Sequence, residues 1–432
     1  MKMANMDDYF DVVIVGTGAA GLYCALNLPA RYRILLLTKQ KADESDSFLA
    51  QGGICMQHGE ADYRPFFDDT MRAGHYENNP ATVDLMIRSS NSIIRDLVRR
   101  GVRFARDDHG ALRFTREGAH SRPRILFHED ITGHEITQTL LNEVLRCENI
   151  ELREHTILLD FFADASACGG VIAAGPDGEP RAIGAGAVVL ACGGIGGLYK
   201  NSTNFPHITG DAIAMALRHG VACEHLDYIQ IHPTTLYSHR KGRRFLISES
   251  VRGEGALLLD KNGDRFTNEL QPRDVVSAAI RAQMEKDGTD HVWEDMRPIG
   301  EAAIREHFPN ILERCEEEGY DPIHEPIPVV PAQHYFMGGI TADLSSRTAL
   351  PRLYACGETC CNGVHGRNRL ASNSLLESLV FAQRAADDIL YGEPPAFTGD
   401  KPDLAPYREQ EPLFAAYRQE VLTAIERSKN HE

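Results

Sequence analysis

The ten residues from Val12 to Gly21 constrain the fold of this chain more than any other segment. Four β-branched residues run directly into the pattern Gly-x-Gly-x-x-Gly, and an Ala-rich stretch to Leu28 continues with a helical composition. A buried strand that turns sharply into a helix brings the free N–H groups of that helix to a diphosphate. Gly16 permits the turn, Gly18 lets the backbone approach the phosphates, and Gly21 lets the helix pack on the strand. The segment therefore predicts a dinucleotide site in an α/β domain.

Two later apolar runs also end in glycine, at the edge where a doubly wound sheet meets its ligand. One is Ala187–Gly194, which ends in Gly193-Gly194, and the other is Leu353–Glu358, which contains Gly357 near its end. The second parallel strand, expected at Arg33–Thr38, ends in Lys39 instead of the carboxylate that binds the ribose of NAD. This departure argues against a simple NAD site.

The other elements follow from hydrophobic periodicity and turn residues. Ile157–Ala174 and Arg181–Leu190 predict antiparallel strands around a turn at Gly175-Pro176-Asp177-Gly178. Helical patterns cover four segments: 68–100, 131–145, 212–219 and a helix that begins near Ser372.

Composition narrows the class of protein. The 432 residues, 43% hydrophobic, can form two or three domains. The net charge of −17 argues against nucleic acid or an anionic membrane as a partner, although a local Arg and His cluster could still bind a small anion. We expect a cytoplasmic protein, because no apolar stretch is long enough for a membrane span and Met1–Asp11 is too polar for a signal peptide. The ten cysteines form no C-x-x-C pair, so we expect neither a metal site nor a disulfide framework.

A change of character near Tyr228 predicts an inserted domain. Arg, His and Glu become frequent from there to Ala332, and the proline-rich segment Pro322–Pro331 is interpreted as a hinge. The nucleotide domain would then occupy 1–227 and 336–395, with a capping domain at 228–335 between them. The remainder, 396–432, is predicted to be a loosely held tail, because the chain from Gly392 onward is rich in Pro and charge.

Several further short motifs follow one another along the chain. They are Gln51-Gly52-Gly53, Thr115–Ser121, Thr209-Gly210-Asp211, Gln230–Thr234, Glu249–Gly255, Pro272–Asp274, His334-Tyr335, Gly357-Glu358 and His365–Glu377. Together with the glycine-ended strands, they resemble the flavoproteins of the succinate dehydrogenase and fumarate reductase family over about residues 10–395. The resemblance implies a Rossmann-like FAD-binding domain, discontinuous in sequence, with an inserted α+β capping domain. Amino-acid oxidases of this family usually continue into a C-terminal helical domain, where this sequence has only a short tail.

The resemblance also implies which residues surround FAD. They are Gly16, Thr17, Gly18, Ala19, Ala20, Gly21, Lys39, Asp46, Ser47, Phe48, Leu49, Ala50, Gln51, Gly52, Gly53, Asp211, Glu358, Ser374 and Leu375. The amides of Ser374 and Leu375 would lie at the pyrimidine edge of the flavin, where a helix N-terminus favours negative charge on the reduced ring. Respiratory members attach FAD through a His just before the Gly-Gly of this loop. Asp46 stands there in this sequence, so we expect FAD to be bound non-covalently.

A second set of residues would contact the substrate. The expected catalytic residues are Arg273, Glu117, His232, His334 and Arg369, and Gln230 and Ser248 join four of these in substrate binding. Arg369 would clamp a carboxylate with the two histidines, and Arg273 would exchange a proton over the reacting carbons. Ser248 replaces the Thr that the family tends to carry and keeps its hydroxyl. Glu117 would bind an α-ammonium group.

The implied reaction is removal of the α-hydrogen of L-aspartate as hydride to FAD. This would give 2-iminosuccinate, with dioxygen or fumarate reoxidising the flavin, as the first step of de novo NAD biosynthesis. A handover of the imine to quinolinate synthase would be consistent with its instability. Two alternatives remain. One is a soluble flavoprotein subunit of a fumarate reductase or succinate dehydrogenase, and the other is a flavin-containing assembly subunit without turnover.

Overall fold

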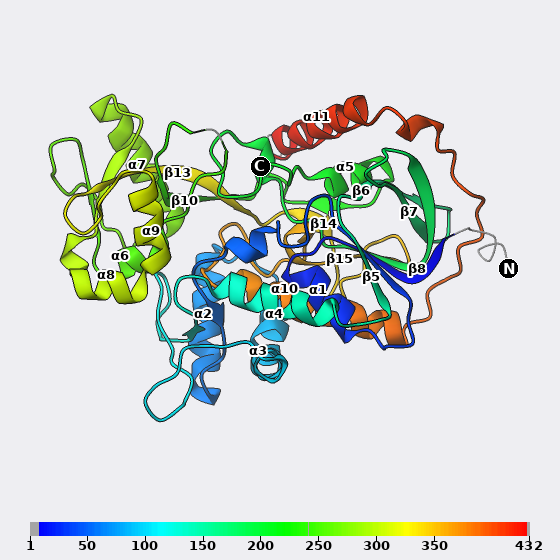
Figure 1. Cartoon of the computed structure of the whole chain (residues 1–432), viewed down its shortest axis with the longest axis horizontal. Coiled ribbons are helices and arrows are strands. Elements are labelled where there is room, and N and C mark those ends of the chain that lie inside the picture. Colours follow the sequence, from blue (N-terminus) through cyan, green and yellow to red (C-terminus); the bar gives the residue numbers. More distant parts are fainter. Residues whose placement is uncertain (1–7, 241, 430–432) are drawn as a thin grey trace.

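The computed structural model describes residues 8–240 and 242–429 (Figure 1). Most of the segment Met1–Asp11, on which the expectation of no signal peptide rests, therefore lies outside the described residues, as do both outer domain limits. Within the described part of the chain, no helix has both the length and the apolar character that crossing a bilayer demands.

A seven-stranded sheet forms the base of the fold. Its order is β5-β2-β1-β8-β7-β6, and a further strand, β15, pairs with β8. The strands are β1 (Tyr9–Val15), β2 (Ile34–Leu37), β5 (Ile150–Arg153), β6 (Ile157–Ala163), β7 (Cys168–Ala174), β8 (Pro180–Leu190) and β15 (Leu353–Ala355). β1, β2, β8 and β15 run parallel, so their carboxyl ends meet at one edge. The predicted α/β fold is confirmed.

The long strand β8 pairs antiparallel with one neighbour and parallel with another. Its first half lies antiparallel to β7 across the predicted turn, and its second half lies parallel to β1, with Val188 opposite Val13. The two overlapping strands expected at 181–190 and 187–194 are therefore one continuous strand, which ends at Leu190. The run Ile157–Ala174, by contrast, divides into the hairpin β6–β7.

Alternation along β1 supplies a core on each face of the sheet. Val12 and Ile14 contact one cluster, with α1 (Ala19–Asn27), α3 (Pro80–Arg100), α4 (Thr132–Val144) and α10 (Asn373–Tyr391). Val13 and Val15 contact the other, with α5 (Asp211–Arg218) and α11 (Gln410–Lys429). The two groups of helices lie on opposite sides of the sheet in Figure 1. This is the layered arrangement that helices on both faces of a parallel sheet produce.

The helix predicted over 68–100 is wrong in its middle. α2 (Tyr63–Ala73) ends before Gly74, and α3 begins only at Pro80. In the loop between the two helices, His75 and Tyr76 both have positive φ. The Asn79 side chain then caps α3 by accepting from the Ala81 N–H at 3.0 Å. Proline at the first position of a helix cannot continue a preceding one, so the sequence breaks the helix here.

The expectation of a loosely held tail is also wrong. Within it lies the twenty-residue helix α11, whose Tyr417, Val421 and Ile425 are buried in the core shared with α5. The Tyr417 hydroxyl donates to the Leu159 carbonyl at 2.7 Å. Residues spaced four apart line one helix face, and this stripe outweighs the charged composition of the rest. The last three residues, 430–432, lie outside the described chain.

The insert forms a second lobe, at the left of Figure 1. Its antiparallel sheet has the order β10-β13-β12-β11, from β10 (Ile229–Leu236), β11 (Leu257–Leu259), β12 (Val292–Asp295) and β13 (Ile327–Phe336). Four helices pack on it around a separate core: α6 (Glu249–Gly253), α7 (Arg273–Asp287), α8 (Glu301–His307) and α9 (Pro309–Glu317). The segment interpreted as a hinge, Pro322–Pro331, is half β-strand, because Pro328 and Pro331 lie in β13. Two small sheets complete the chain: β3 (Ile54–Cys55) with β4 (Ile125–Leu126), and β9 (Cys223–Glu224) and β16 (Cys360–Cys361) flanking β14 (Gly339–Thr341).

Candidate active site

A cavity of about 360 Å³ lies between the carboxyl edge of the large sheet and the inserted lobe. This size is typical of a small-molecule site. All the residues expected at the cofactor and the substrate line it, except Ala19, Gly21 and Gln230. Segments separated by more than 300 residues thus meet at one place.

The turn between β1 and α1 fits only glycine at two of its positions. Gly16 has φ of +115°, and a Cβ there would lie 2.0 Å from the Ala191 carbonyl oxygen at the end of β8. A Cβ on Gly21 would lie 1.9 Å from the Gly16 carbonyl oxygen. Gly21 therefore lets the helix approach the strand, while Gly16, Thr17 and Gly18 form the cavity wall.

Buried polar atoms without a partner surround the cofactor end of the cavity. Within residues 8–240 and 242–429, no hydrogen bond reaches Thr17 Oγ1, Asp46 Oδ2 or Gln51 Oε1. Buried polar atoms are normally paired, so these three fit a ligand rich in hydroxyl and amide groups. Lys39 forms an ion pair with Asp211 at the start of α5, and its Nζ donates to the His207 carbonyl at 3.0 Å. The residues present therefore suit a nucleotide of the size and polarity of FAD.

Two buried carboxyl groups are shifted toward their neutral forms. Burial raises the pKa of Asp46 to about 7, although the Phe205 N–H donates to its Oδ1 at 2.9 Å. Burial also raises the pKa of Glu358 to about 8, with the nearby Asp46 adding to the shift. The Phe336 N–H donates to Glu358 at 2.9 Å. Once protonated, each carboxyl can donate as well as accept a hydrogen bond.

At the other end of the cavity two arginines share one amide. Gln230 Oε1 accepts from Arg273 Nη1 at 2.9 Å and from Arg369 Nε at 3.3 Å. Arg369 also donates to the Ser374 hydroxyl at 2.6 Å and lies 4.3 Å above the Tyr335 ring. Burial and the neighbouring Arg273 lower the pKa of Arg369 to about 10. Gln230 is thus positioned to orient both guanidinium groups, although it does not line the cavity itself.

Two histidines stand close together on the neighbouring strands β10 and β13. The rings of His232 and His334 lie 5.3 Å apart. His232 Nε2 is 2.9 Å from the Ile247 carbonyl, so this nitrogen carries the proton, and its Nδ1 has no partner among the described residues. His334 Nδ1 lies 2.8 Å from the Thr203 hydroxyl. Burial and the nearby arginines hold the pKa of both rings well below the usual value, so both are neutral at pH 7.

Two glutamates complete this end of the cavity. Glu117 accepts hydrogen bonds from the Ser372 hydroxyl at 2.7 Å and the Ser250 hydroxyl at 3.3 Å. Glu249 accepts from Arg273 Nε at 2.5 Å. Burial and the charge of Glu249 raise the pKa of Glu117. Burial would also raise the pKa of Glu249, but the charges of Arg273 and Arg252 outweigh it and lower that pKa.

Sequence reasoning missed several residues that line or support this site. Glu249 was quoted only as the start of a motif, and its pairing with Arg273 joins α6 to α7. Arg243 lines the cavity opposite Asp46, and the basic run His239–Arg244 was the one signal for it. Thr203, Ser250 and Ser372 are single small polar residues, which no periodicity or spacing distinguishes.

Comparisons with known proteins agree with this geometry. Residues 11–375 match the family described as FAD binding domain. The chain is 48% identical to an L-aspartate oxidase of Clostridium perfringens, covering 88% of this chain and 86% of that protein. It is 44% identical to an L-aspartate oxidase of Nostoc, covering 98% and 76%. Its fold matches an E. coli quinol fumarate reductase with a TM-score of 0.83 at 31% identity, covering 95% of this chain and 74% of that one.

The fold and its nucleotide cradle define an FAD-dependent oxidoreductase of the succinate dehydrogenase and fumarate reductase type. Within that group, the sequence identity to L-aspartate oxidases extends over most of the chain and identifies the family. The chain belongs to the L-aspartate oxidase family.

Proposed function

We propose that this enzyme oxidises L-aspartate to 2-iminosuccinate with non-covalently bound FAD, as the first step of de novo NAD biosynthesis. The observation that carries the proposal is the charge pattern of one cavity. Arg273, Arg369 and the neutral His334 can bind two carboxylates there, and Glu117 adds an anion for an ammonium group. L-aspartate carries these three charges.

FAD, when bound, would supply an acceptor for one hydride, that is, for two electrons and one proton. On the protein side, the glycine turn and the N-terminus of α1 would hold the diphosphate, and Glu358 and Asp46 would offer hydrogen bonds to hydroxyl groups. The N-terminus of the nineteen-residue helix α10 brings the amides of Ser374 and Leu375 into the cavity wall. Its dipole favours negative charge at that point.

The two arginines would contact different parts of the dicarboxylate substrate. Arg369 clamps one carboxylate, with His334 available beside it. His232 Nδ1 carries no proton and can only accept a hydrogen bond, so it is not the carboxylate donor that the resemblance implies. Ser248, at the N-cap of α6, offers its hydroxyl to the same end of the substrate. Gln230 accepts from both guanidinium groups and would fix their orientation.

Arg273 stands over the reacting carbons, held in place by Glu249 and Gln230. With FAD bound to receive the α-hydrogen and its two bonding electrons, the ammonium group would pass one proton to the Glu117 carboxylate as the C=N bond forms. Glu117 accepts hydrogen bonds from that ammonium group and orients it. The inserted lobe covers the site and excludes water, which would hydrolyse the imine.

Dioxygen or fumarate would reoxidise the flavin, and the short-lived imine would be handed to quinolinate synthase. A fumarate reductase or succinate dehydrogenase subunit is the second candidate, because Arg369, Arg273 and His334 would serve any four-carbon dicarboxylate. Glu117 argues against it, since an extra buried carboxylate beside a dianion is unfavourable without a cation between them.

An amino-acid panel tests the proposal. The purified flavoprotein is assayed with several L-amino acids and succinate for hydrogen peroxide release, and separately for turnover that depends on fumarate. We expect L-aspartate alone to support either activity. Turnover of succinate without turnover of L-aspartate would establish the second candidate instead.

A further inference from the structure

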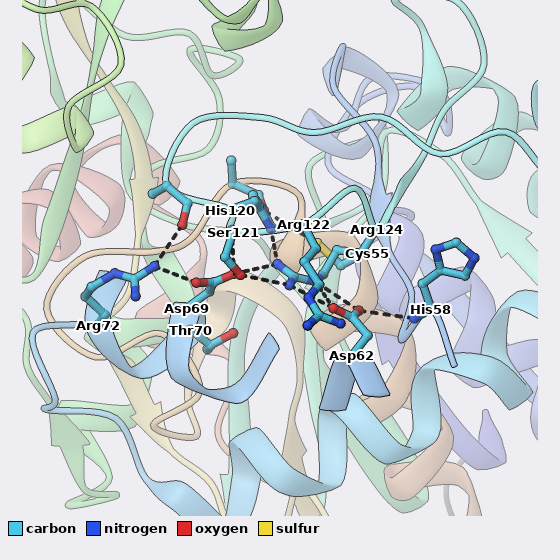
Figure 2. Close-up of polar contacts among 12 residues, drawn as sticks. Cys55, His58, Asp62, Asp69, Thr70, Arg72, His120, Ser121, Arg122 and Arg124 are labelled. Atoms are coloured by element: carbon cyan, nitrogen blue, oxygen red, sulfur yellow. Dashed lines mark hydrogen bonds and ion pairs between the residues drawn. The ribbon is translucent and has the colours of Figure 1, made fainter. Parts of the chain in front are cut away.

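A buried ionic cluster centred on Arg124 (Figure 2) contacts the segment Thr115–Ser121, which carries Glu117. The Arg124 side chain is fully buried, with Nη2 2.9 Å from Asp62 and Nη1 2.8 Å from Asp69. Its Nη1 also lies 2.8 Å from His120 Nδ1. The predicted substrate loop Thr115–Ser121 is therefore joined to the segment that carries Asp62 and to α2.

Arg124 fixes the proton of His120. A guanidinium only donates hydrogen bonds, so His120 Nδ1 accepts and the proton resides on Nε2. Burial and the charge of Arg124 lower the pKa of His120 to about 4, so the ring is neutral. Its Nε2–H then donates to the Ala371 carbonyl at 3.0 Å, directly before α10.

The residue after Ala371 is held in an unusual conformation. Ser372 has φ of +60°, in the left-handed region that residues other than glycine rarely adopt. The Cys55 N–H donates to its carbonyl at 3.0 Å, and the Gly53 N–H donates to its Oγ at 3.1 Å. Because Oγ accepts from Gly53, its own proton points to Glu117 Oε2 at 2.7 Å.

The same cluster anchors the loop beyond Glu117. The N–H and hydroxyl of Ser121 both donate to Asp69, at 2.7 and 2.6 Å, and Arg72 donates to the Ala119 carbonyl at 3.3 Å. Glu117 is thus held through its backbone from one side and through its carboxylate from the other.

We propose that Ser372 and His120 are positioning residues that aim the Glu117 carboxylate at the ammonium group of the substrate, with Arg124 holding His120. The proposal rests on the proposed function, in which Glu117 binds that group. It makes the preference for an amino acid over a plain dicarboxylate depend on a hydrogen-bonded chain that acts through Glu117.

Ser372→Gly tests the chain, because glycine adopts positive φ freely and the substitution removes the hydroxymethyl side chain without straining the backbone. We expect the KM for L-aspartate to rise about tenfold, as for the loss of one hydrogen bond to a charged group. The Kd for succinate, measured from the absorbance change of the bound flavin, should stay within about twofold, because succinate has no ammonium group.

Ser346→Gly is the matched control. Ser346 is also fully buried with φ of +62°, and its hydroxyl donates to the Phe381 carbonyl at 2.9 Å, away from the cavity. This variant loses the same kind of group from the same conformation. It should leave both constants unchanged.

A pH profile separates positioning of Glu117 from general loosening. The charged and titratable groups that act on or respond to Glu117 are Glu249, Arg273, Arg369 and Cys55. The Ser372 hydrogen bond lowers the pKa of Glu117, so its loss raises that pKa. Since ionised Glu117 binds the ammonium group, the acid limb of kcat/KM for L-aspartate should move to higher pH in Ser372→Gly only.

Two substitutions at His120 test the other end of the chain. A glutamine amide can replace Nε2–H as the donor to Ala371, whereas leucine cannot. We expect His120→Leu to raise the KM for L-aspartate as Ser372→Gly does, and His120→Gln to restore most of the affinity.

Glu117→Gln distinguishes a failure of the positioning proposal from a failure of the proposed function. If Glu117→Gln weakens L-aspartate selectively and Ser372→Gly does not, the positioning proposal is wrong and the proposed function stands. Equal weakening of L-aspartate and succinate in Ser372→Gly would also overturn it. If Glu117→Gln has no selective effect, the assignment of Glu117 in the proposed function fails.

Discussion

Replacing each active-site arginine by leucine should separate substrate binding from turnover. In Arg369→Leu the clamp on one carboxylate disappears, while Gln230 Oε1 keeps its 2.9 Å bond from Arg273. A charge-assisted hydrogen bond contributes about 1.5–3 kcal/mol. The Kd for succinate should therefore rise roughly ten-fold to more than a hundred-fold, with a smaller effect on kcat.

Arg273→Leu should behave differently, because Arg273 is paired. Its removal leaves Glu249 buried without its 2.5 Å partner. Breaking a buried ion pair costs about 3–5 kcal/mol, so this variant should also melt at a lower temperature. Turnover should fall by several orders of magnitude while succinate still binds through Arg369. Arg273→Lys, which keeps a charge for Glu249, controls for the stability loss.

The assay uses holoenzyme with its FAD content checked by absorbance. Succinate is titrated anaerobically for Kd, and L-aspartate turnover gives kcat. The reasoning would be refuted if both variants kept normal kinetics, or if Arg369→Leu lost kcat with an unchanged Kd.

Three other outcomes follow from the same geometry. Acid precipitation should release FAD into the supernatant, since Asp46 and no histidine precedes Gly52-Gly53; flavin on the pellet would contradict this. Gly21→Ala should abolish FAD binding or folding, because its Cβ would meet the Gly16 carbonyl at 1.9 Å, and a variant that elutes with full FAD would show the turn to be adaptable. Tyr417→Phe should lower the free energy of unfolding by about 1–3 kcal/mol, by leaving the Leu159 carbonyl unpaired; unchanged denaturant unfolding would argue against the docking of α11.

The nucleotide cradle could be predicted because its requirements are local. A β-branched run followed by spaced glycines specifies strand, turn and helix within about twenty residues. The alternation of Val12 and Ile14 with Val13 and Val15 further specifies two buried faces, and the structure fills both.

Two predictions of secondary structure were wrong, one for the helix over 68–100 and one for the C-terminal segment, because each overlooked a local signal. Proline at 80 and left-handed residues at 75 and 76 break a helix that hydrophobic spacing alone would continue. In the C-terminal segment, overall composition obscured the stripe of Tyr417, Val421 and Ile425.

The missed site residues depend on tertiary contacts. Ser372 matters because the backbone of Gly53, 319 residues earlier, donates to it, and Glu249 matters because α7 brings Arg273 beside it. Neither contact can be predicted from the spacing of residues or from hydrophobic periodicity in the sequence. Resemblance to a family supplied the residues that are expected to contact ligands, whereas the structure shows which residues hold those side chains in place.

Anaerobic titration of the oxidised flavoprotein with L-aspartate tests the central claim most directly. L-aspartate should bleach the flavin absorbance of the wild type to completion without an external acceptor. Glu117→Gln should need a far higher L-aspartate concentration, although it binds succinate normally. Full bleaching by succinate but not by L-aspartate, or equal responses of the wild type and Glu117→Gln, would contradict the account.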